Sequence, residues 1–133
     1  MKWTNVRKLK SSDLLEKIEK QFSISFPREY KDLIGQYNAG IPDCKNFNVN
    51  KKKYQIERLI SANLSDNPNI YTAMTWVEQT PQSIIIPIAL DILGNMIALN
   101  FEEHSYCIVF INFENGHKYF ITQTLEDFIS ILI

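Results

Sequence analysis

The sequence contains little that would stabilise a secreted fold or cross a membrane. Its 133 residues include only two cysteines, four glycines and five prolines. Cys44 and Cys107 lie far apart without Cys-x-x-Cys spacing, which favours buried free thiols over a disulfide or a metal pair. The N-terminus lacks the apolar run of a secretory signal, and the longest apolar run, Ile84 to Leu90, is too short to span a bilayer. These absences predict a cytoplasmic protein that does not associate with membranes.

The sequence also lacks the residue patterns that catalysis, metal binding or phosphate binding would need. It has no nucleophile with a neighbouring base, no glycine-rich phosphate loop and no ligand set with metal spacing. His104 and His117 are isolated histidines in predicted loops. Asp91, Glu102 and Glu103 could act as acid and base or hold a cation, but turn formation and solvation explain them more simply. The sequence therefore predicts no catalytic residue, no cofactor and no metal.

What the sequence does contain is enough apolar material for one core. Apolar residues make up 45% of the chain and aromatic residues 12%. A chain of this size buries roughly two thirds of the surface that it exposes when unfolded. Because no linker, repeat or low-complexity segment interrupts it, we expect one domain spanning residues 1–133.

The net charge of −1 hides a strong asymmetry along the chain. Residues 1–60 carry a net charge of +6, whereas residues 61–133 carry −7 and include one basic residue, Lys118. Such a division is typical of a protein with a charged partner, unless folding interleaves the two halves. The basic arm at residues 2–10 and the Lys51–Lys53 triplet, with Trp3 and Tyr54 able to stack on bases, would suit nucleic acid. An isoelectric point near 6.1 argues against that partner.

Helical periodicity marks both ends of the chain. The predicted helices cover residues 13–22, 27–37 and 124–132, with a weaker one at 70–78. Asp13, followed by Glu16, is expected to cap the first helix, and Thr124, followed by Asp127, to cap the last. Asn38-Ala39-Gly40 is expected to provide a left-handed exit from the second helix.

Short apolar runs between the helices predict strands. The clearest pair, Ile86–Leu90 and Met96–Phe101, is separated by five residues in which Asp91 can accept a bond from a following N–H and Gly94 can take positive φ. Further strands are expected at 47–49, 54–60, 106–113 and 119–122, with Lys51–Lys53 and Asn115-Gly116 in the connections. This order predicts an α+β fold: a largely antiparallel (mixed) sheet with helices packed on it, an N-terminal helix pair and a C-terminal closing helix.

Three segments resemble the SUKH superfamily, the Smi/Knr-like proteins. Phe26–Ile34 followed by Asn38-Ala39-Gly40 is similar to the family's LPxxYxxFL…NGG element. Ile86–Leu99 resembles its IPIAxDxxGNxIxL hairpin, and Thr124–Ile129 its SFxEFL closing helix. Two positions depart from the pattern: Ala39 replaces a usual glycine, and Glu103–Tyr106 lacks the glycine that usually precedes the next strand.

The resemblance implies a binding protein. Members of this superfamily are largely bacterial immunity proteins, which bind and neutralise the toxin domain of a polymorphic or contact-dependent toxin, often a nuclease or a deaminase. The family also includes a fungal regulator of cell-wall synthesis, so the alternative is a regulatory scaffold that docks on cellular enzymes. The expected partner is thus a cognate protein toxin domain, and the sequence leaves the oligomeric state open.

The acidic half of the chain supplies the predicted binding surface. A toxin that grips phosphates presents a basic cleft, and a carboxylate-rich inhibitor surface would match its potential. The carboxylates expected in loops or at strand ends, and hence at the interface, are Glu78, Asp91, Glu102, Glu103 and Glu114. Nearby aromatic residues that could anchor an interface, but are expected in the core, are Trp76, Tyr106 and Phe113.

Overall fold

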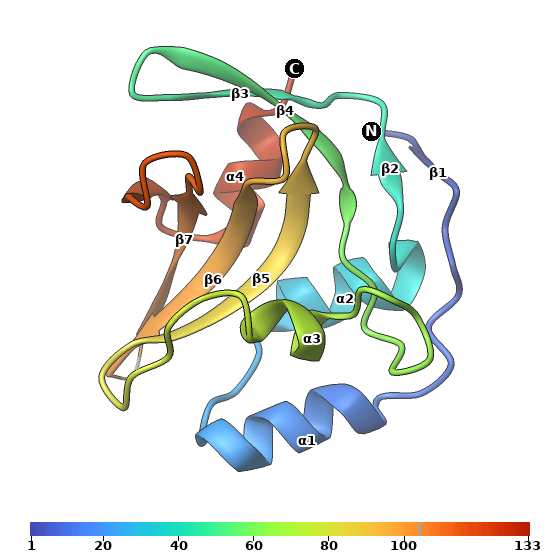
Figure 1. Cartoon of the computed structure of the whole chain (residues 1–133). Coiled ribbons are helices and arrows are strands. Elements are labelled where there is room, and N and C mark those ends of the chain that lie inside the picture. The colour runs from blue at the N-terminus through green and yellow to red at the C-terminus, as the bar shows by residue number, and fades with distance from the viewer. Residues whose placement is uncertain (104) are drawn as a thin grey trace.

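The computed structural model describes residues 1–103 and 105–133; His104, one of the two histidines considered as metal ligands, lies outside the described residues (Figure 1). The helices are α1 (Asp13–Phe22), α2 (Arg28–Tyr37), α3 (Ile70–Met74) and α4 (Leu125–Ile131). The strands are β1 (Trp3–Thr4), β2 (Ile41–Pro42), β3 (Asn46–Val49), β4 (Lys52–Leu59), β5 (Ile84–Asp91), β6 (Met96–Glu102), β7 (Ser105–Ile111) and β8 (Lys118–Thr122). Within the described ranges, no helix is long and apolar enough to cross a membrane.

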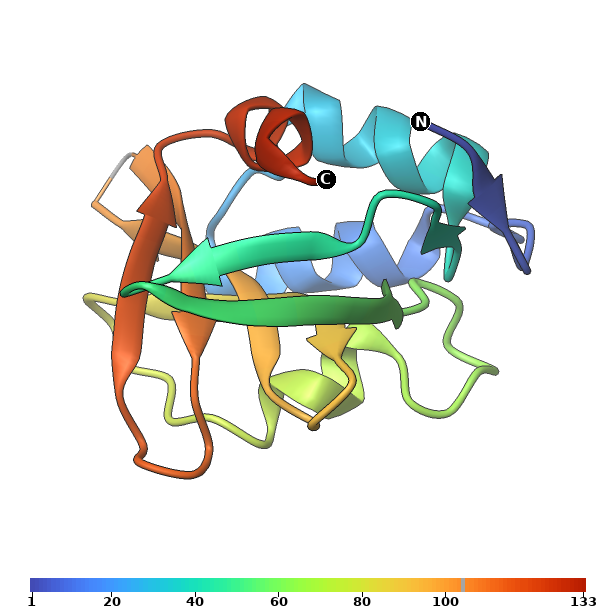
Figure 2. The same ribbon diagram turned by 90° about the horizontal axis from the view of Figure 1, so that it is seen from above.

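Six strands form one sheet whose spatial order follows the chain, β3-β4-β5-β6-β7-β8. Every neighbouring pair in it is antiparallel, and β1 pairs with β2 in a separate two-stranded sheet. Helices α2 and α4 lie on one side of the large sheet, whereas α3 lies on the other side against β5 (Figures 1 and 2). The predicted α+β fold, with its helix pair and closing helix, is confirmed.

The ends of three helices show which of the predicted capping and termination residues set the helix bounds. Helix α4 begins as predicted, because the Thr124 side chain accepts the Asp127 N–H at 3.1 Å. Helix α1 has the predicted bounds, but its N-cap is Ser12 and Asp13 is its first helical residue. Helix α3 ends at Met74, four residues earlier than expected. Beyond it the chain turns towards β5, where Gln79 bonds to the Met74 carbonyl and to both backbone groups of Ile85.

The core lies between the sheet and helices α2 and α4. An aromatic cluster joins three elements there: Phe47 of β3 packs edge-on against Phe110 of β7 at 5.8 Å and Phe128 of α4 at 5.5 Å between ring centroids. All three side chains are buried. Tyr106 of β7 ties the two helices together, because its hydroxyl donates to the Glu29 carboxylate and accepts the Leu125 N–H at 3.2 Å. Burial and the neighbouring Glu29 raise the pKa of Tyr106 to about 12.

The lysine triplet differs from its predicted position between two strands. Asn50 and Lys51 form the β3–β4 turn, both with positive φ (51° and 68°), and Lys52 and Lys53 are the first residues of β4. A two-residue turn with both φ values positive matches the twist of the strands that it joins. The β3–β4 connection is therefore two residues long, shorter than the three-lysine connection that the sequence predicts.

Asn38 joins three segments that are distant in the sequence. Its side chain is fully buried; Nδ2 donates to the Arg7 carbonyl at 2.8 Å and to the Ser61 hydroxyl at 3.1 Å, and Oδ1 accepts the Ala62 N–H at 2.8 Å. Ser61 in turn donates to Asp66 at 2.6 Å. That hydrogen bond, more than any other contact, lowers the pKa of Asp66 against the opposing effect of burial. Asn38 is thus a structural crosslink as well as the residue after α2.

The two residues after Asn38 have different backbone requirements. Ala39 has the left-handed conformation that the sequence predicts for the exit from α2, with φ of 61°. Gly40 is needed for space instead: a Cβ there would lie 2.8 Å from the Tyr37 carbonyl oxygen and 3.2 Å from a Val6 methyl group. A backbone oxygen cannot move aside as a flexible side chain can.

Replacing Gly40 with alanine should therefore destabilise the protein. We expect Gly40→Ala to lower the free energy of unfolding by about 1–3 kcal/mol through overpacking. Gly35 is the matched control, because it lies on the exposed side of α2 and a Cβ there meets nothing within 4 Å. Gly35→Ala should raise stability by about 1 kcal/mol through helix propensity. Urea denaturation measures both, and equal shifts would contradict the steric explanation.

Candidate partner-binding surface

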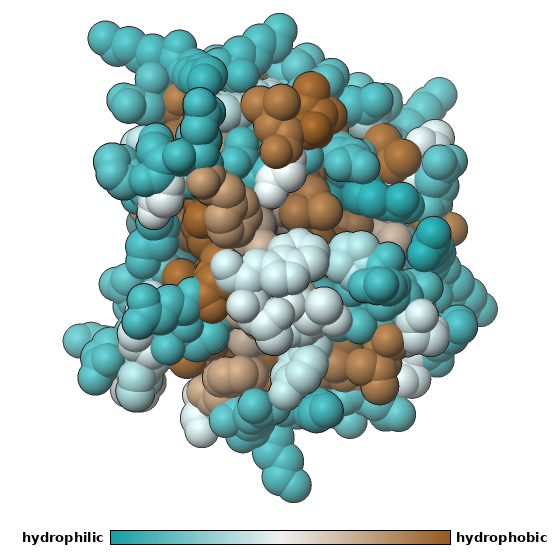
Figure 3. Space-filling model, in the orientation of Figure 1, coloured by the Kyte–Doolittle hydropathy of each residue, from teal (hydrophilic) through white to brown (hydrophobic). Residues whose placement is uncertain are grey.

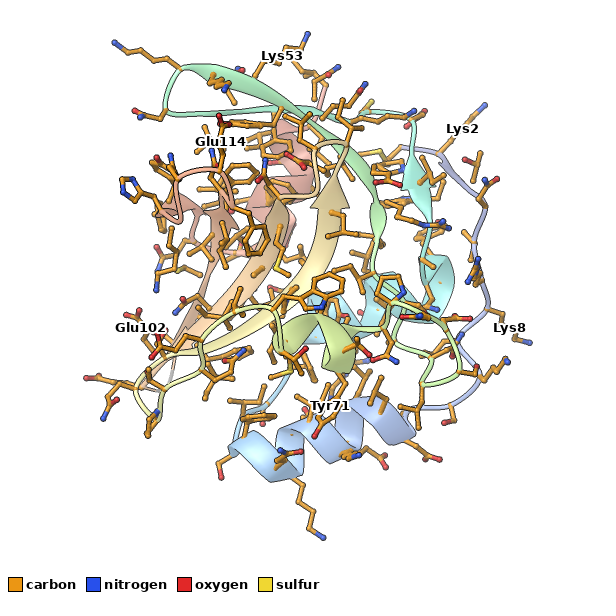
Figure 4. The ribbon with its side chains drawn as sticks, in the orientation of Figure 1. Lys2, Lys8, Lys53, Tyr71, Glu102 and Glu114 are labelled. Carbon is orange, nitrogen blue, oxygen red and sulfur yellow. The ribbon has the colours of Figure 1, made fainter. Side chains whose placement is uncertain are left out.

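The five carboxylates predicted at an interface do not form one cluster. Glu102 ends β6 and Glu103 follows it, while Glu78 lies in the loop that leads from α3 to β5. Glu114 lies in the β7–β8 connection, at the opposite end of the strands from Glu102, as Figure 4 shows. It lines a cleft of about 470 Å³ together with Lys52. We therefore define an acidic end by Glu102 and Glu103, which line one groove, and describe Glu78 and Glu114 separately.

Asp91 was expected where a partner could reach it, and this expectation is wrong. Its side chain is 0% exposed. One carboxylate oxygen accepts the N–H groups of Leu93 at 2.9 Å and Asn95 at 2.7 Å, and the other accepts the Asn95 side-chain amide at 3.0 Å. Gly94 takes φ of 85°, as predicted for this turn. The aspartate closes the β5–β6 hairpin from within, so it cannot contact another protein.

A groove opens at the acidic end and has a volume of about 870 Å³. It lies where the α1–α2 connection, the start of β5 and the end of β6 meet. The half-buried apolar side chains that line it are Phe22, Ile24, Ile84 and Phe101. Its other lining residues are Ser23, Pro81, Gln82, Ser83, Glu102, Glu103 and Ser105. The groove thus combines apolar walls with two carboxylates.

A polar network supports one of these carboxylates. Asn100 of β6 is 1% exposed, and its side-chain oxygen accepts from Lys118 Nζ at 2.9 Å and from Ser83 Oγ at 3.3 Å. Its amide nitrogen donates to Glu102 at 3.2 Å, and Lys118 Nζ lies 3.7 Å from the same Glu102 oxygen. Lys118 therefore offsets part of the Glu102 charge. Sequence reasoning missed Asn100, because an asparagine inside an apolar strand gives no sign of its partners.

Glu103 presents its carboxylate from a strained backbone. It is exposed and has φ of 58°, a left-handed conformation that costs an L-residue roughly 1–2 kcal/mol. Among residues 1–103 and 105–133, neither Glu103 nor Glu78 forms an ion pair. The resemblance leads one to expect a glycine in this segment, and glycine adopts positive φ without strain. Glu103 therefore places a negative charge at a position where the backbone favours glycine.

Two of the three candidate aromatic anchors lie at the surface. Trp76 is 46% exposed and Phe113 is 44% exposed, so their predicted core placement is wrong. Trp76 follows α3, in the same loop as Glu78 and the groove residues Pro81–Ser83, whereas Phe113 lies near Glu114 in the sequence. Tyr106 is half-buried beneath α4. Figure 3 shows the face that α3 partly covers, where separate apolar patches lie around a centre of intermediate hydropathy and hydrophilic groups form most of the edge.

Apart from Lys118, which contacts Glu102, three lysines of the basic half lie away from the acidic end. Lys2 and Lys8 lie along the N-terminal segment and Lys53 lies on the β3–β4 hairpin, all remote from Glu102 in Figure 4. In the described part of the chain, no group of three or more His, Cys, Asp or Glu side chains is placed to hold a metal ion. The arrangement offers charge and apolar surface to a partner.

Comparison with protein-family models assigns the chain to a family. The model described as SMI1 / KNR4 family (SUKH-1) matches residues 11–131. The chain therefore belongs to this family, as the three sequence motifs indicated, and the match supports an immunity-type or SMI1/KNR4-type role. No curated protein and no solved structure matches the chain.

Removing the Asp91 carboxylate should unfold the hairpin turn. We expect Asp91→Ala to lower the free energy of unfolding by about 2–4 kcal/mol, because it removes the acceptor of three hydrogen bonds and leaves the buried N–H and side-chain amide of Asn95 without a partner. Asp32→Ala removes an exposed carboxylate, paired only with Arg28 at 3.7 Å, and should change stability by less than about 0.5 kcal/mol. If chemical denaturation gave the two variants the same stability, Asp91 would have no structural role in the turn.

Proposed function

We propose that this protein is an immunity protein that binds and neutralises the toxin domain of a polymorphic or contact-dependent toxin. The observation that carries the proposal, within the family assigned above, is the acidic end of the sheet. The exposed carboxylates of Glu102 and Glu103 stand there beside an apolar groove, and Glu103 forms no ion pair with described residues. A nuclease or deaminase domain with a basic nucleic-acid cleft has the complementary potential.

The loop between α3 and β5 gives this surface an aromatic element. Trp76 and Glu78 are exposed in the first part of this loop, and its last residues, Pro81–Ser83, line the groove. Tryptophan is among the residues most often found at interface hot spots, where a large rigid side chain becomes desolvated. In this proposal Trp76 supplies affinity, while Glu78, Glu102 and Glu103 supply encounter rate and specificity. Glu114 and Phe113, at the opposite end of the strands, contribute at the periphery.

The alternative function is a regulatory scaffold that docks on cellular enzymes, and the family assignment is compatible with this function as well. Both functions use protein binding without bond-making by this chain, but they differ in their biological result. An immunity protein should rescue cells that express the C-terminal domain of the toxin encoded by the adjacent gene. A scaffold should give no rescue and should co-purify with host enzymes.

Reversing the charge of the acidic end should slow association with that toxin domain. We expect Glu102→Lys combined with Glu103→Lys to lower the association rate constant about tenfold at low ionic strength, with the difference shrinking as salt is added. Asp32→Lys combined with Glu57→Lys makes the same change in net charge at exposed positions elsewhere. Stopped-flow or surface-based kinetics measures both pairs. Equal association rates for both would count against the acidic end as the binding surface.

Glu103→Gly should change stability and binding in opposite directions. Because glycine takes positive φ without steric strain, the free energy of unfolding should rise by about 1 kcal/mol. The association rate constant should fall severalfold, because an exposed carboxylate has been removed. Glu114→Gly removes the same charge at the periphery of the proposed surface and should slow association less than Glu103→Gly. A Glu103→Gly variant that is more stable and binds as fast as the wild type would remove Glu103 from the interface.

A further inference from the structure

The groove at the acidic end has two kinds of wall. Phe22 and Ile24 come from the end of α1 and the residues after it, and Ile84 and Phe101 face each other as partners across β5 and β6. These four side chains are only partly buried, so they keep apolar area in contact with solvent. Exposed apolar area that is rimmed by polar groups is a feature of interaction sites.

Charge is concentrated at one side of this groove. Glu102 is partly offset by Lys118, but Glu103 has no ion-pair partner among the described residues. The lining residues include no lysine or arginine. A cationic group of a bound partner would therefore lie near net negative charge, and the aliphatic part of that partner would pack on the apolar walls.

The volume and shape limit what can occupy the groove. About 870 Å³ lies at the upper end of the range for sites that hold drug-sized ligands, roughly 300–1,000 Å³, and it exceeds what a single side chain needs. The lining residues with polar side chains are all exposed or half-buried, so no buried polar group is available to orient a small metabolite. A short protein segment with mixed apolar and basic character fits these features better.

We propose that the groove receives a surface segment of the toxin domain in which a lysine or arginine is flanked by apolar residues. The apolar side chains pack on Phe22, Ile24, Ile84 and Phe101, and the cation reaches Glu103 and Glu102. Long basic side chains suit this arrangement, because their methylene stems pack on apolar surface while the charged group stays near water. This inference rests on the proposed function, and it identifies the part of the toxin that the acidic end recognises.

The test separates the groove from the charges on its rim. Gln82 is exposed at the groove wall and makes no side-chain hydrogen bond to any described residue, so Gln82→Trp fills the groove without removing a contact. With the C-terminal domain of the toxin encoded by the adjacent gene as the probe, we expect this variant to raise the dissociation rate constant at least tenfold. Its association rate constant at low salt should stay within about twofold, because no charge has changed.

Two further variants make the result specific. Gln36→Trp introduces the same bulk on the exposed side of α2 and should leave both rate constants unchanged. Ile24→Ser removes apolar lining instead of blocking it and should also raise the dissociation rate, with circular dichroism confirming that the variant is folded. If the toxin domain binds but Gln82→Trp and Ile24→Ser dissociate like the wild type, the groove is not the recognition site and this inference is overturned. If the toxin domain does not bind the wild-type protein, the proposed function itself fails.

Discussion

The buried carboxylate of Asp91 is the interaction on which the arrangement of the sheet depends. Its three accepted hydrogen bonds close the β5–β6 turn, and the turn sets the register of these two central strands. Next to the turn, Leu90 pairs with Met96, but an irregularity between Pro87 and Ala89 shifts the pairing by one residue. Beyond this bulge Ile84 lies opposite Phe101, and Glu102 and Glu103 reach the groove. The candidate surface is therefore positioned by the turn and the bulge of the same two strands together.

The charge asymmetry along the chain persists in space only in part. Because the large sheet follows chain order, the basic β3–β4 hairpin and the acidic end of β6 remain in different parts of the molecule. Elsewhere the two halves meet, because Arg7 pairs with Asp66 at 3.4 Å. At the predicted carboxylates, Lys118 approaches Glu102 at 3.7 Å, and Lys52 shares a cleft with Glu114. These two lysines offset part of the negative charge of Glu102 and Glu114, and Glu103 is therefore the strongest candidate for an interface carboxylate.

Positive φ and lack of space for a side chain occur at different positions in this chain. At Gly40 a carbonyl oxygen excludes any side chain, so the fold demands glycine. At Ala39 and Glu103 the backbone has positive φ but there is room for a side chain, and the chain carries non-glycine residues there. Ala39 is buried, so its methyl group gains packing that offsets part of the strain. Glu103 is exposed and gains no such packing, and strained exposed residues of this kind are often associated with function.

The elements whose signals are local could be predicted from the amino-acid sequence. The α4 cap at Thr124, the Asp91–Gly94 turn and the apolar stripe of α1 all depend on residues a few positions apart, and the structure contains each of them. The family was also readable, because its motifs are continuous in the chain. Which polar and aromatic side chains stay exposed depends on contacts between distant segments, and the local sequence does not show it. Asp91 is buried while Trp76 is exposed, because burial depends on neighbours from distant segments, and the groove exists only where three such segments converge.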